Sequence, residues 1–299
     1  MIYTLTLNPA LDYVIRVDNF GTGKINRVKE ENIYYGGKGI NVSWILRELD
    51  IHSTALGFIA GFTGKALREG LEKQGISTDL IEVAEGMTRI NVKMHSDDET
   101  EINGTGPVIT EEDLQKLMEK TSKLKKDDIL VLSGSIPSCL GKDTYERIIA
   151  GLPEGVMFTA DAEKELLLKT LKYKPFLIKP NHIELGDMFS AELKSEEDIV
   201  FYARKLQEAG ARNVLISMAK DGALLLSEDG DIFRRKAAQG TVVNSVGAGD
   251  SMVAGFLGGW LKSKDYAYAL KLGTACGGAT AFHSGLATGN EIRKVLQTL

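Results

Sequence analysis

The chain has 299 residues, with 36 Lys plus Arg against 41 Asp plus Glu, a formal net charge of −5 and 43% hydrophobic residues. These values are typical of a globular enzyme with one large domain or two small ones, and the mild acidity disfavours a general nucleic-acid binder, whose footprint is a basic patch. No apolar run approaches the roughly 20 residues that span a bilayer, so neither a membrane nor a nucleic-acid partner is expected.

The N-terminal segment, Met1 to Pro9, lacks the charged region of a signal peptide and reaches proline too early for one, so it is predicted to be a strand. The two cysteines, Cys139 and Cys276, have no metal-ligand spacing. Their small number favours a reducing compartment over a disulfide framework. We therefore expect a cytoplasmic protein.

An amide and a carboxylate, Asn8 and Asp12, follow the first strand. Ligands of open α/β sheets bind beyond the carboxyl ends of strands. Asp12 could there accept hydrogen bonds from sugar hydroxyl groups. Solvated turn residues are the alternative interpretation.

Two stretches, at about 11–36 and 87–106, are richer in alternating and polar residues than their surroundings. Alternation suits strands with one buried face, so we predict a small β lid formed by two insertions, with the acidic run 97–101 as a solvated hairpin tip. No linker or repeat interrupts the chain, which predicts a single α/β domain over residues 1–299. Because an exposed apolar sheet face needs a cover, we also predict a homodimer built partly from the two lids.

The segment Gly36-Gly37-Lys38-Gly39-Ile40-Asn41 opens a predicted helix that runs to about Leu49. Glycines let a backbone approach a ligand closely, Lys38 supplies a point charge for an anion, and Asn41 offers both a donor and an acceptor. A capped helix start without a ligand is the alternative.

Short, wholly apolar strands alternate with helical patterns through the second half of the chain. This alternation predicts a doubly wound α/β core, in which helices cover both faces of a mainly parallel sheet. The chain has neither the phosphate loop of P-loop ATPases nor the glycine fingerprint of dinucleotide-binding dehydrogenases, which disfavours both classes. The predicted strands are 129–132, 156–160, 176–178 and 214–217, and the predicted helices are 142–150, 163–171, 182–189 and 196–209.

The segment Gly247-Ala248-Gly249-Asp250 precedes a periodic apolar stretch. Three small residues at a helix start leave backbone N–H groups open at the positive end of the helix dipole, which favours an anion. Asp250 could accept the proton of a hydroxyl group that attacks a bound phosphoryl group. The dipole should keep Asp250 ionised and make it a weak base. A glycine-rich helix entry with a stabilising acidic residue is the alternative.

Together, the two glycine segments resemble motifs of the ribokinase/PfkB family of carbohydrate kinases. The resemblance to this family extends over nearly the whole chain. Thr4 to Asp12, Leu132 to Pro137 and Lys179 to Glu184 are similar to its 1-phosphofructokinase and tagatose-6-phosphate kinase branch. The resemblance implies a ribokinase-like fold with a β lid and an ATP- and Mg²⁺-dependent kinase of a ketohexose monophosphate. Fructose 1-phosphate is the first candidate and tagatose 6-phosphate the second. A non-catalytic sugar-phosphate sensor on the same scaffold is the alternative from another class.

The resemblance also implies individual roles. Asp250 would be the base and the amides of Gly247, Ala248 and Gly249 the anion hole. Asn181 and Glu184 would organise Mg²⁺ largely through water, with a helix-capping pair as the alternative. The sugar would contact Asp12, Gly37 and Asn41, with Ser133 as a weaker candidate; its phosphate would contact Lys38, Arg89 and Arg27; and ATP would contact Gly249 and the segment Ser217, Met218, Ala219, Lys220, Asp221 and Gly222.

Three further segments bear on the resemblance. Ala219 stands where a glycine is usual in the family, which puts the geometry of that turn in question. Ser138 and Cys139 stand where a proline and a glycine are common. The stretch Gly273 to Ala279 predicts a closely packed helix, which in the family walls the adenine pocket.

Overall fold

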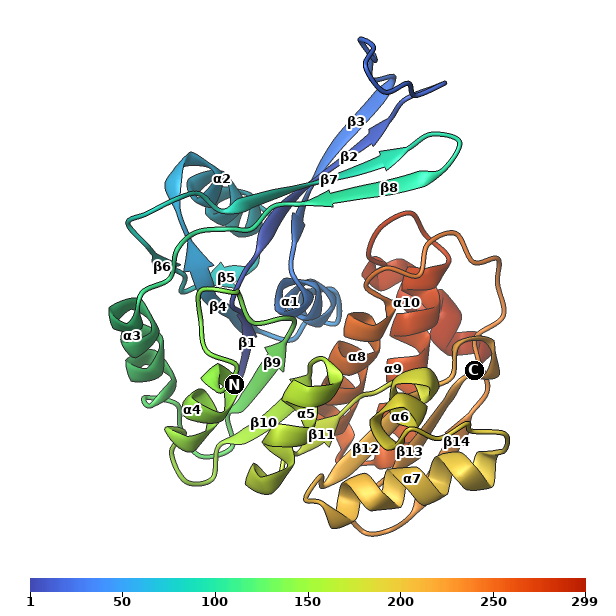
Figure 1. Ribbon diagram of the computed structural model, residues 1–299. Coiled ribbons are helices and arrows are strands. Elements are labelled where there is room, and N and C mark those ends of the chain that lie inside the picture. Colours follow the sequence, from blue (N-terminus) through green and yellow to red (C-terminus); the bar gives the residue numbers. More distant parts are fainter.

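The computed structural model describes residues 1–299, whose strands form one large and one small sheet (Figure 1). The large sheet has the order β14-β13-β12-β11-β10-β9-β1-β4-β5, with β6 paired to β4. Strands β1, β4, β5, β6 and β9 to β12 pair in parallel, and only β13 is antiparallel to its neighbours, β12 and β14. The expected mainly parallel sheet is confirmed. Its strands are β1 (Ile2–Thr6), β4 (Ser53–Ile59), β5 (Ser77–Thr78), β6 (Ile81–Glu82), β9 (Ile129–Ser133), β10 (Met157–Asp161), β11 (Leu177–Ile178), β12 (Asn213–Ser217), β13 (Ala223–Leu226) and β14 (Ile232–Arg235).

Helices cover both faces of this sheet, as expected for a doubly wound core. Strand β9 shows why its sequence is apolar throughout: Ile129 and Val131 pack in the core on one face, and Leu130 and Leu132 in the core on the other. No helix is long and apolar enough to cross a membrane. One face carries α1 (Lys38–Glu48), α2 (Gly61–Lys73), α8 (Ala248–Ser263), α9 (Tyr266–Ala281) and α10 (Gly289–Thr298); the other carries α3 (Glu111–Thr121), α4 (Thr144–Ala150), α5 (Lys164–Thr170), α6 (His182–Phe189) and α7 (Glu196–Glu208).

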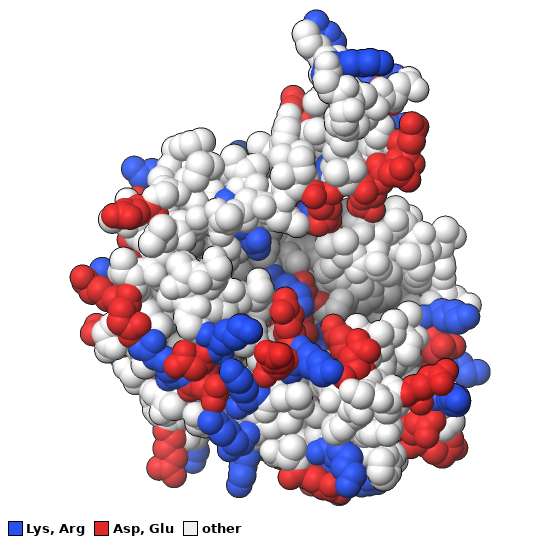
Figure 2. Space-filling model, in the orientation of Figure 1, with Lys and Arg blue, Asp and Glu red and all other residues white.

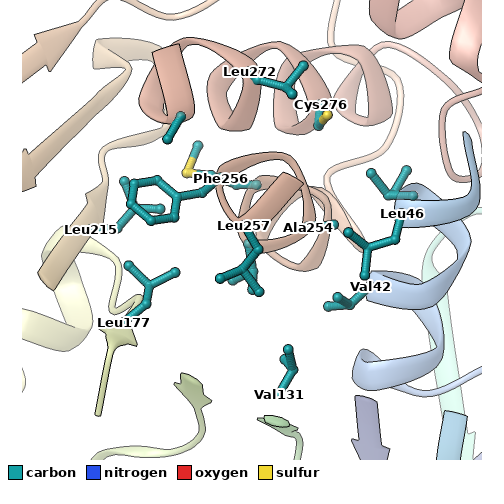
Figure 3. Packing of buried hydrophobic residues seen from close by; sticks show 14 of the residues in the cluster. Val42, Leu46, Val131, Leu177, Leu215, Ala254, Phe256, Leu257, Leu272 and Cys276 are labelled. Atoms are coloured by element: carbon teal, nitrogen blue, oxygen red, sulfur yellow. The ribbon is translucent and has the colours of Figure 1, made fainter. Parts of the chain in front are cut away.

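Helix α8 lies in the middle of the larger core. Figure 3 shows Phe256 and Leu257 of α8 between Leu177 and Leu215 of the sheet on one side and α9 on the other. Because this helix is wrapped by apolar groups, its N-terminus is fixed relative to the carboxyl edge of the sheet. Asp250 lies in its first turn.

The small sheet consists of β2 (Ala10–Arg16), β3 (Glu30–Gly36), β7 (Arg89–His95) and β8 (Glu99–Asn103), in the order β3-β2-β7-β8. It projects from the body of the molecule (Figure 1). These strands come from the two stretches expected to form a β lid, and the expected small β sheet is confirmed. Both cysteines are free, Cys276 buried and Cys139 exposed.

Strand register gives the lid two unlike faces, because residues paired across strands point to the same side. Tyr13 pairs with Ile33 and Val92, and Val92 pairs with Ile102, which makes an apolar row. At the base of this face Leu11 joins a core with Leu67 and Leu71 of α2. The opposite face is polar and carries Asp12, Asn91 and Lys93.

Candidate active site

Most of the predicted site residues follow strands at the carboxyl edge of the large sheet or begin the helices there. Figure 2 shows a hollow beneath the lid, with acidic and basic side chains along its floor. Four of the eight buried polar atoms without a partner come from segments at this edge: Thr6 Oγ1, Asn8 Oδ1, Ser133 Oγ and His182 Nδ1. Buried polar groups in proteins are normally hydrogen-bonded, so orphans gathered in one place indicate a ligand. Ser133, ranked lowest from sequence, is one of them.

The N-terminus of α8 offers free backbone donors. Gly247 is its N-cap residue, with φ 79°. The N–H groups of Gly247, Gly249 and Asp250 have no acceptor in the protein, whereas that of Ala248 donates to the Ser245 carbonyl oxygen at 3.2 Å. The open amides therefore differ from the expected set: Ala248 is engaged and the Asp250 amide takes its place.

Asp250 is 5% exposed and accepts a hydrogen bond from Asn41 Nδ2 at 2.8 Å. Burial raises the pKa of Asp250 to about 7, and the negative charge of Asp161 acts in the same direction; the Asn41 hydrogen bond and the charges of Lys38 and Lys179 offset only part of this. This raised pKa contradicts the expectation that Asp250 is a weak base, because burial disfavours the charged carboxylate.

Asp161, at the end of β10, is buried and lies at the centre of a charge cluster. Its carboxylate oxygens lie 3.5 Å from Lys179 Nζ and 3.8 Å from Lys38 Nζ. Lys179 Nζ lies 3.1 Å from the position that a Cβ on Gly249 would occupy, beside the open amides. Sequence reasoning gave neither Asp161 nor Lys179 a role. The available signal was that both stand at or just beyond the carboxyl ends of buried strands.

The glycines at the start of α1 lie so close to neighbouring atoms that larger side chains would not fit. A Cβ on Gly36 would lie 2.4 Å from Asp12 Oδ2, and a Cβ on Gly39 would lie 2.7 Å from Thr6 Oγ1 and 2.9 Å from the Leu5 carbonyl oxygen. Gly37 has φ 138°, which L side chains rarely adopt. The segment thus presses α1 against β1 and leaves room for the Asp12 carboxylate.

The lid supplies a second polar group around Asp12. Asn91 Nδ2 donates to Asp12 Oδ1 at 2.8 Å, and Lys93 Nζ lies 3.5 Å from Asp12 Oδ2. Arg89 is partly buried and its Nε donates to the Asn8 carbonyl oxygen at 3.1 Å. Burial lowers the pKa of Arg89, and the charge of Asp12 opposes this. Asn91 and Lys93 were not predicted, because only the strand register brings them to Asp12.

The three residues predicted to bind the substrate phosphate, Lys38, Arg89 and Arg27, have different surroundings. Lys38 belongs with Asp161, whose charge raises the pKa of this lysine, and Arg89 belongs with Asp12. Arg27 is exposed in the segment between β2 and β3 and has no ion pair or hydrogen bond. Lys38 and Arg89 therefore have different acidic partners, and Arg27 has none.

Asn181 and Glu184 form the capping box of α6. Asn181 Oδ1 accepts from the Glu184 amide at 2.8 Å, and Glu184 Oε2 accepts from the Asn181 amide at 2.7 Å. The helix-capping alternative is thus present, but Glu184 is exposed and its Oε1 is free. No group of three or more His, Cys, Asp or Glu side chains could hold a metal ion. Mg²⁺ keeps most of its waters, so one carboxylate fits such an ion.

The predicted nucleotide segment follows β12. The Ser217 amide donates to the Pro180 carbonyl oxygen at 3.2 Å, which places the segment beside Asn181. Ala219 has φ 48°, a left-handed conformation that costs a non-glycine residue about 1–2 kcal/mol. Ala219, which stands where the family usually has glycine, therefore adopts a conformation that favours glycine. Gly222, with φ 93°, has no room for a Cβ, which would lie 2.1 Å from the Arg235 carbonyl oxygen.

Comparison with known proteins shows that this chain is similar to carbohydrate kinases over nearly its whole length. The family model described as "pfkB family carbohydrate kinase" matches residues 5–293. The chain is 47% identical over 297 residues to a 1-phosphofructokinase of Bacillus subtilis, covering 99% of this chain and 97% of that protein. It is 38% identical over 300 residues to a D-tagatose-1-phosphate kinase of Bacillus licheniformis, covering 100% and 97%. Phosphofructokinase-2 of Escherichia coli, solved in complex with substrates and products, superposes with a TM-score of 0.93 at 26% identity, covering 100% and 99%.

Proposed function

Because the chain belongs to the pfkB family of carbohydrate kinases, we propose that it transfers the γ-phosphoryl group of ATP to fructose 1-phosphate, giving fructose 1,6-bisphosphate. The chain is a phosphotransferase with an alcohol group as acceptor. The observation that carries the chemistry is Asp250, a buried base with a pKa of about 7 beside open amides and Lys179. The substrate rests on the 1-phosphofructokinase with which the chain shares 47% of its residues.

In the proposed reaction, Asp250 takes the proton of the sugar C6 hydroxyl as its oxygen attacks the γ-phosphorus. The new O–P bond forms, the bond from the γ-phosphorus to the bridging oxygen breaks, and ADP leaves. The open amides of Gly247 and Gly249 face the transferred group, with Lys179 beside them. Fixed donors and cations of this kind stabilise the charge of the transition state.

At the sugar end, Asp12 and the Gly37 backbone would bind hydroxyl groups, with Ser133 as a further polar contact. Arg89 is the proposed ligand of the C1 phosphate, since it lies on the Asp12 side of the cleft. Lys38 lies on the Asp161 side, which supports a role nearer the transferred phosphoryl group. Asn41 would orient Asp250, to which it donates. Arg27 would join the site only if the lid moved.

At the nucleotide end, the segment Ser217 to Gly222 would contact ATP. Asn181 and Glu184 would hold hydrated Mg²⁺, which in kinases neutralises the charge of the phosphates. The two free cysteines and the use of ATP support a cytoplasmic location.

We also propose that residues 1–299 act as a single domain whose lid closes over the sugar, since closure excludes water and limits ATP hydrolysis. The bare apolar row of the lid supports a homodimer through the two lids, with Ile33 59% and Ile102 64% exposed.

The test is a comparison of kcat/KM for fructose 1-phosphate, D-tagatose 1-phosphate, fructose 6-phosphate and tagatose 6-phosphate, with ADP formation as the readout. D-tagatose 1-phosphate is the second candidate because of the 38% identical kinase, and it differs from fructose 1-phosphate only at C4. We expect fructose 1-phosphate to lead by about tenfold or more, the scale on which hydrogen-bonding sites discriminate.

Asp250→Asn is the matched control and should lose about 10²–10⁴-fold in kcat, the contribution of a general base. A higher kcat/KM for D-tagatose 1-phosphate would reassign the substrate. Absence of ADP formation with all four sugars would favour the non-catalytic sensor.

A further inference from the structure

Alternate residues of β7 place three polar side chains on the cleft face of the lid: Arg89, Asn91 and Lys93. Arg89 binds the Asn8 carbonyl oxygen, and Asn91 binds Asp12. The proposed chemistry gives a role to Arg89 but none to Asn91 or Lys93, and Lys93 is the charged one of these two. Its surroundings show what it does.

Lys93 is held between two carboxylates from the neighbouring strands. Its Nζ lies 3.5 Å from Asp12 Oδ2 on β2 and 4.0 Å from Glu101 Oε1 on β8. Its side chain is only 19% exposed and that of Asp12 only 16%. A lysine on the outside of a lid would keep its rotamer freedom in water, and removing such a pair from water costs free energy. The arrangement therefore favours a function over simple solubility.

The Asp12 carboxylate is fixed from both sides. Asn91 occupies a lone pair of Oδ1, Lys93 faces Oδ2, and Gly36 allows the carboxylate to lie against the backbone. An ionised carboxylate offers about four lone-pair sites, so about two remain for hydroxyl groups. The lid thus carries a preoriented acceptor for a polyol.

We propose that Lys93 is a positioning residue for the sugar: it holds the Asp12 carboxylate in the orientation that accepts the ketohexose hydroxyl groups, while Glu101 anchors Lys93 from β8. This inference rests on the proposed function, since it takes Asp12 as a sugar ligand. Lys93 acts through Asp12, so its loss weakens sugar binding and leaves the nucleotide end of the cleft unchanged.

The test is Lys93→Met, assayed with the ketohexose phosphate that the wild-type enzyme uses best. We expect the KM for the sugar phosphate to rise about 10- to 100-fold, the cost of losing a charge-assisted contact, with kcat and the KM for ATP within about twofold. Lys93→Arg should restore most of the loss. Lys29→Met, which removes a lid lysine paired with exposed Asp18, is the matched control and should change neither KM.

A double-mutant cycle with Asp12→Asn decides how Lys93 acts. If it acts through Asp12, Lys93→Met lowers kcat/KM by no more than about twofold in the Asp12→Asn background. The same loss in both backgrounds would overturn the proposal and make Lys93 a direct phosphate ligand. A parallel rise of both KM values would overturn it as well. Asn91→Ala, which frees the other Asp12 oxygen, should show the same KM split and serves if Lys93→Met does not fold.

Failure of this proposal can be told from failure of the proposed function. If fructose 1-phosphate is not the substrate, the wild-type enzyme shows this in the comparison of sugar phosphates, before any variant is made. The Lys93 series then proceeds with the preferred ketohexose phosphate.

Discussion

At the scale of the residue, two opposing effects determine the pKa of Asp250. The open amides of α8 favour its charged form, but its 5% exposure and the nearby Asp161 disfavour it more strongly. A base is most effective when its pKa lies near the working pH, because it is then both deprotonated and basic. Burial thus changes a carboxylate that the dipole alone would leave inert into one suited to neutral pH.

The raised pKa of Asp250 predicts a pH dependence of both rate and stability. We expect kcat/KM to fall below about pH 7, where Asp250 becomes protonated in the free enzyme. Because the folded-state pKa exceeds the ordinary value of 3.8, the folded protein binds the proton more tightly than the unfolded chain. The charged carboxylate therefore costs stability, and this cost grows from about pH 4 to about pH 7, at up to about 1.4 kcal/mol per unit of pKa.

Asp250→Asn removes this cost, so its free energy of unfolding in urea should exceed that of the wild-type protein at pH 8. The two should converge toward pH 4. A wild-type kcat/KM that stays level down to pH 5, or equal stabilities at pH 8, would contradict the raised pKa.

The sequence predicts the residues of this site that belong to local motifs and misses those that depend on pairing. Asp250 and Gly247 precede an apolar helix and are recognisable in one segment. Lys179 meets Asp161 only because β10 and β11 are neighbours in the sheet, and Lys93 meets Asp12 only through the lid register. Such contacts join residues that are far apart in sequence.

At the scale of the element, α8 and α9 pack closely enough to require glycine. A Cβ on Gly255 would lie 2.7 Å from both Cys276 Sγ and the Leu272 carbonyl oxygen. A Cβ on Gly273 would lie 2.9 Å from the Met252 carbonyl oxygen. The sequence predicted that the helix containing residues 273–279 packs closely against another element. Only the fold shows that this element is α8. This contact fixes the height of the α8 N-terminus, and so of Asp250, above the sheet.

Gly255→Ala should therefore destabilise the protein, although alanine favours helices by about 1 kcal/mol over glycine. Overpacking against backbone atoms typically costs about 1–3 kcal/mol, and we expect a net loss in the free energy of unfolding measured in urea. Gly258→Ala on the same helix is the control, since its Cβ would meet only the flexible ends of Ile51 and Leu49. A Gly255→Ala protein as stable as the Gly258→Ala protein would show that the helices can separate without cost.

At the scale of the whole molecule, the lid combines two tasks on its two faces. The polar face carries Asp12, Asn91 and Lys93, the residues proposed to bind or position the sugar, and the apolar face is covered only at its base by α2. The alternating sequence predicted the strands, but the buried face that it implied is present only at the base of the lid. The sequence could not predict how much of the apolar face α2 covers, because this depends on how far the lid projects beyond the body of the molecule (Figure 1).

The bare part of the apolar face supports a second copy of the chain as its cover. Ile33→Asp with Ile102→Asp places two charges in this row, and desolvating them in an interface is costly. We expect the double variant to sediment as a monomer at micromolar concentration where the wild-type protein is a dimer. Its KM for the sugar phosphate should rise, since an uncovered lid holds Asp12 less firmly. Ile232→Asp, an exposed isoleucine on β14, is the matched control and should remain dimeric. A wild-type monomer would refute the lid dimer, and a variant that dimerises normally would place the interface on another surface.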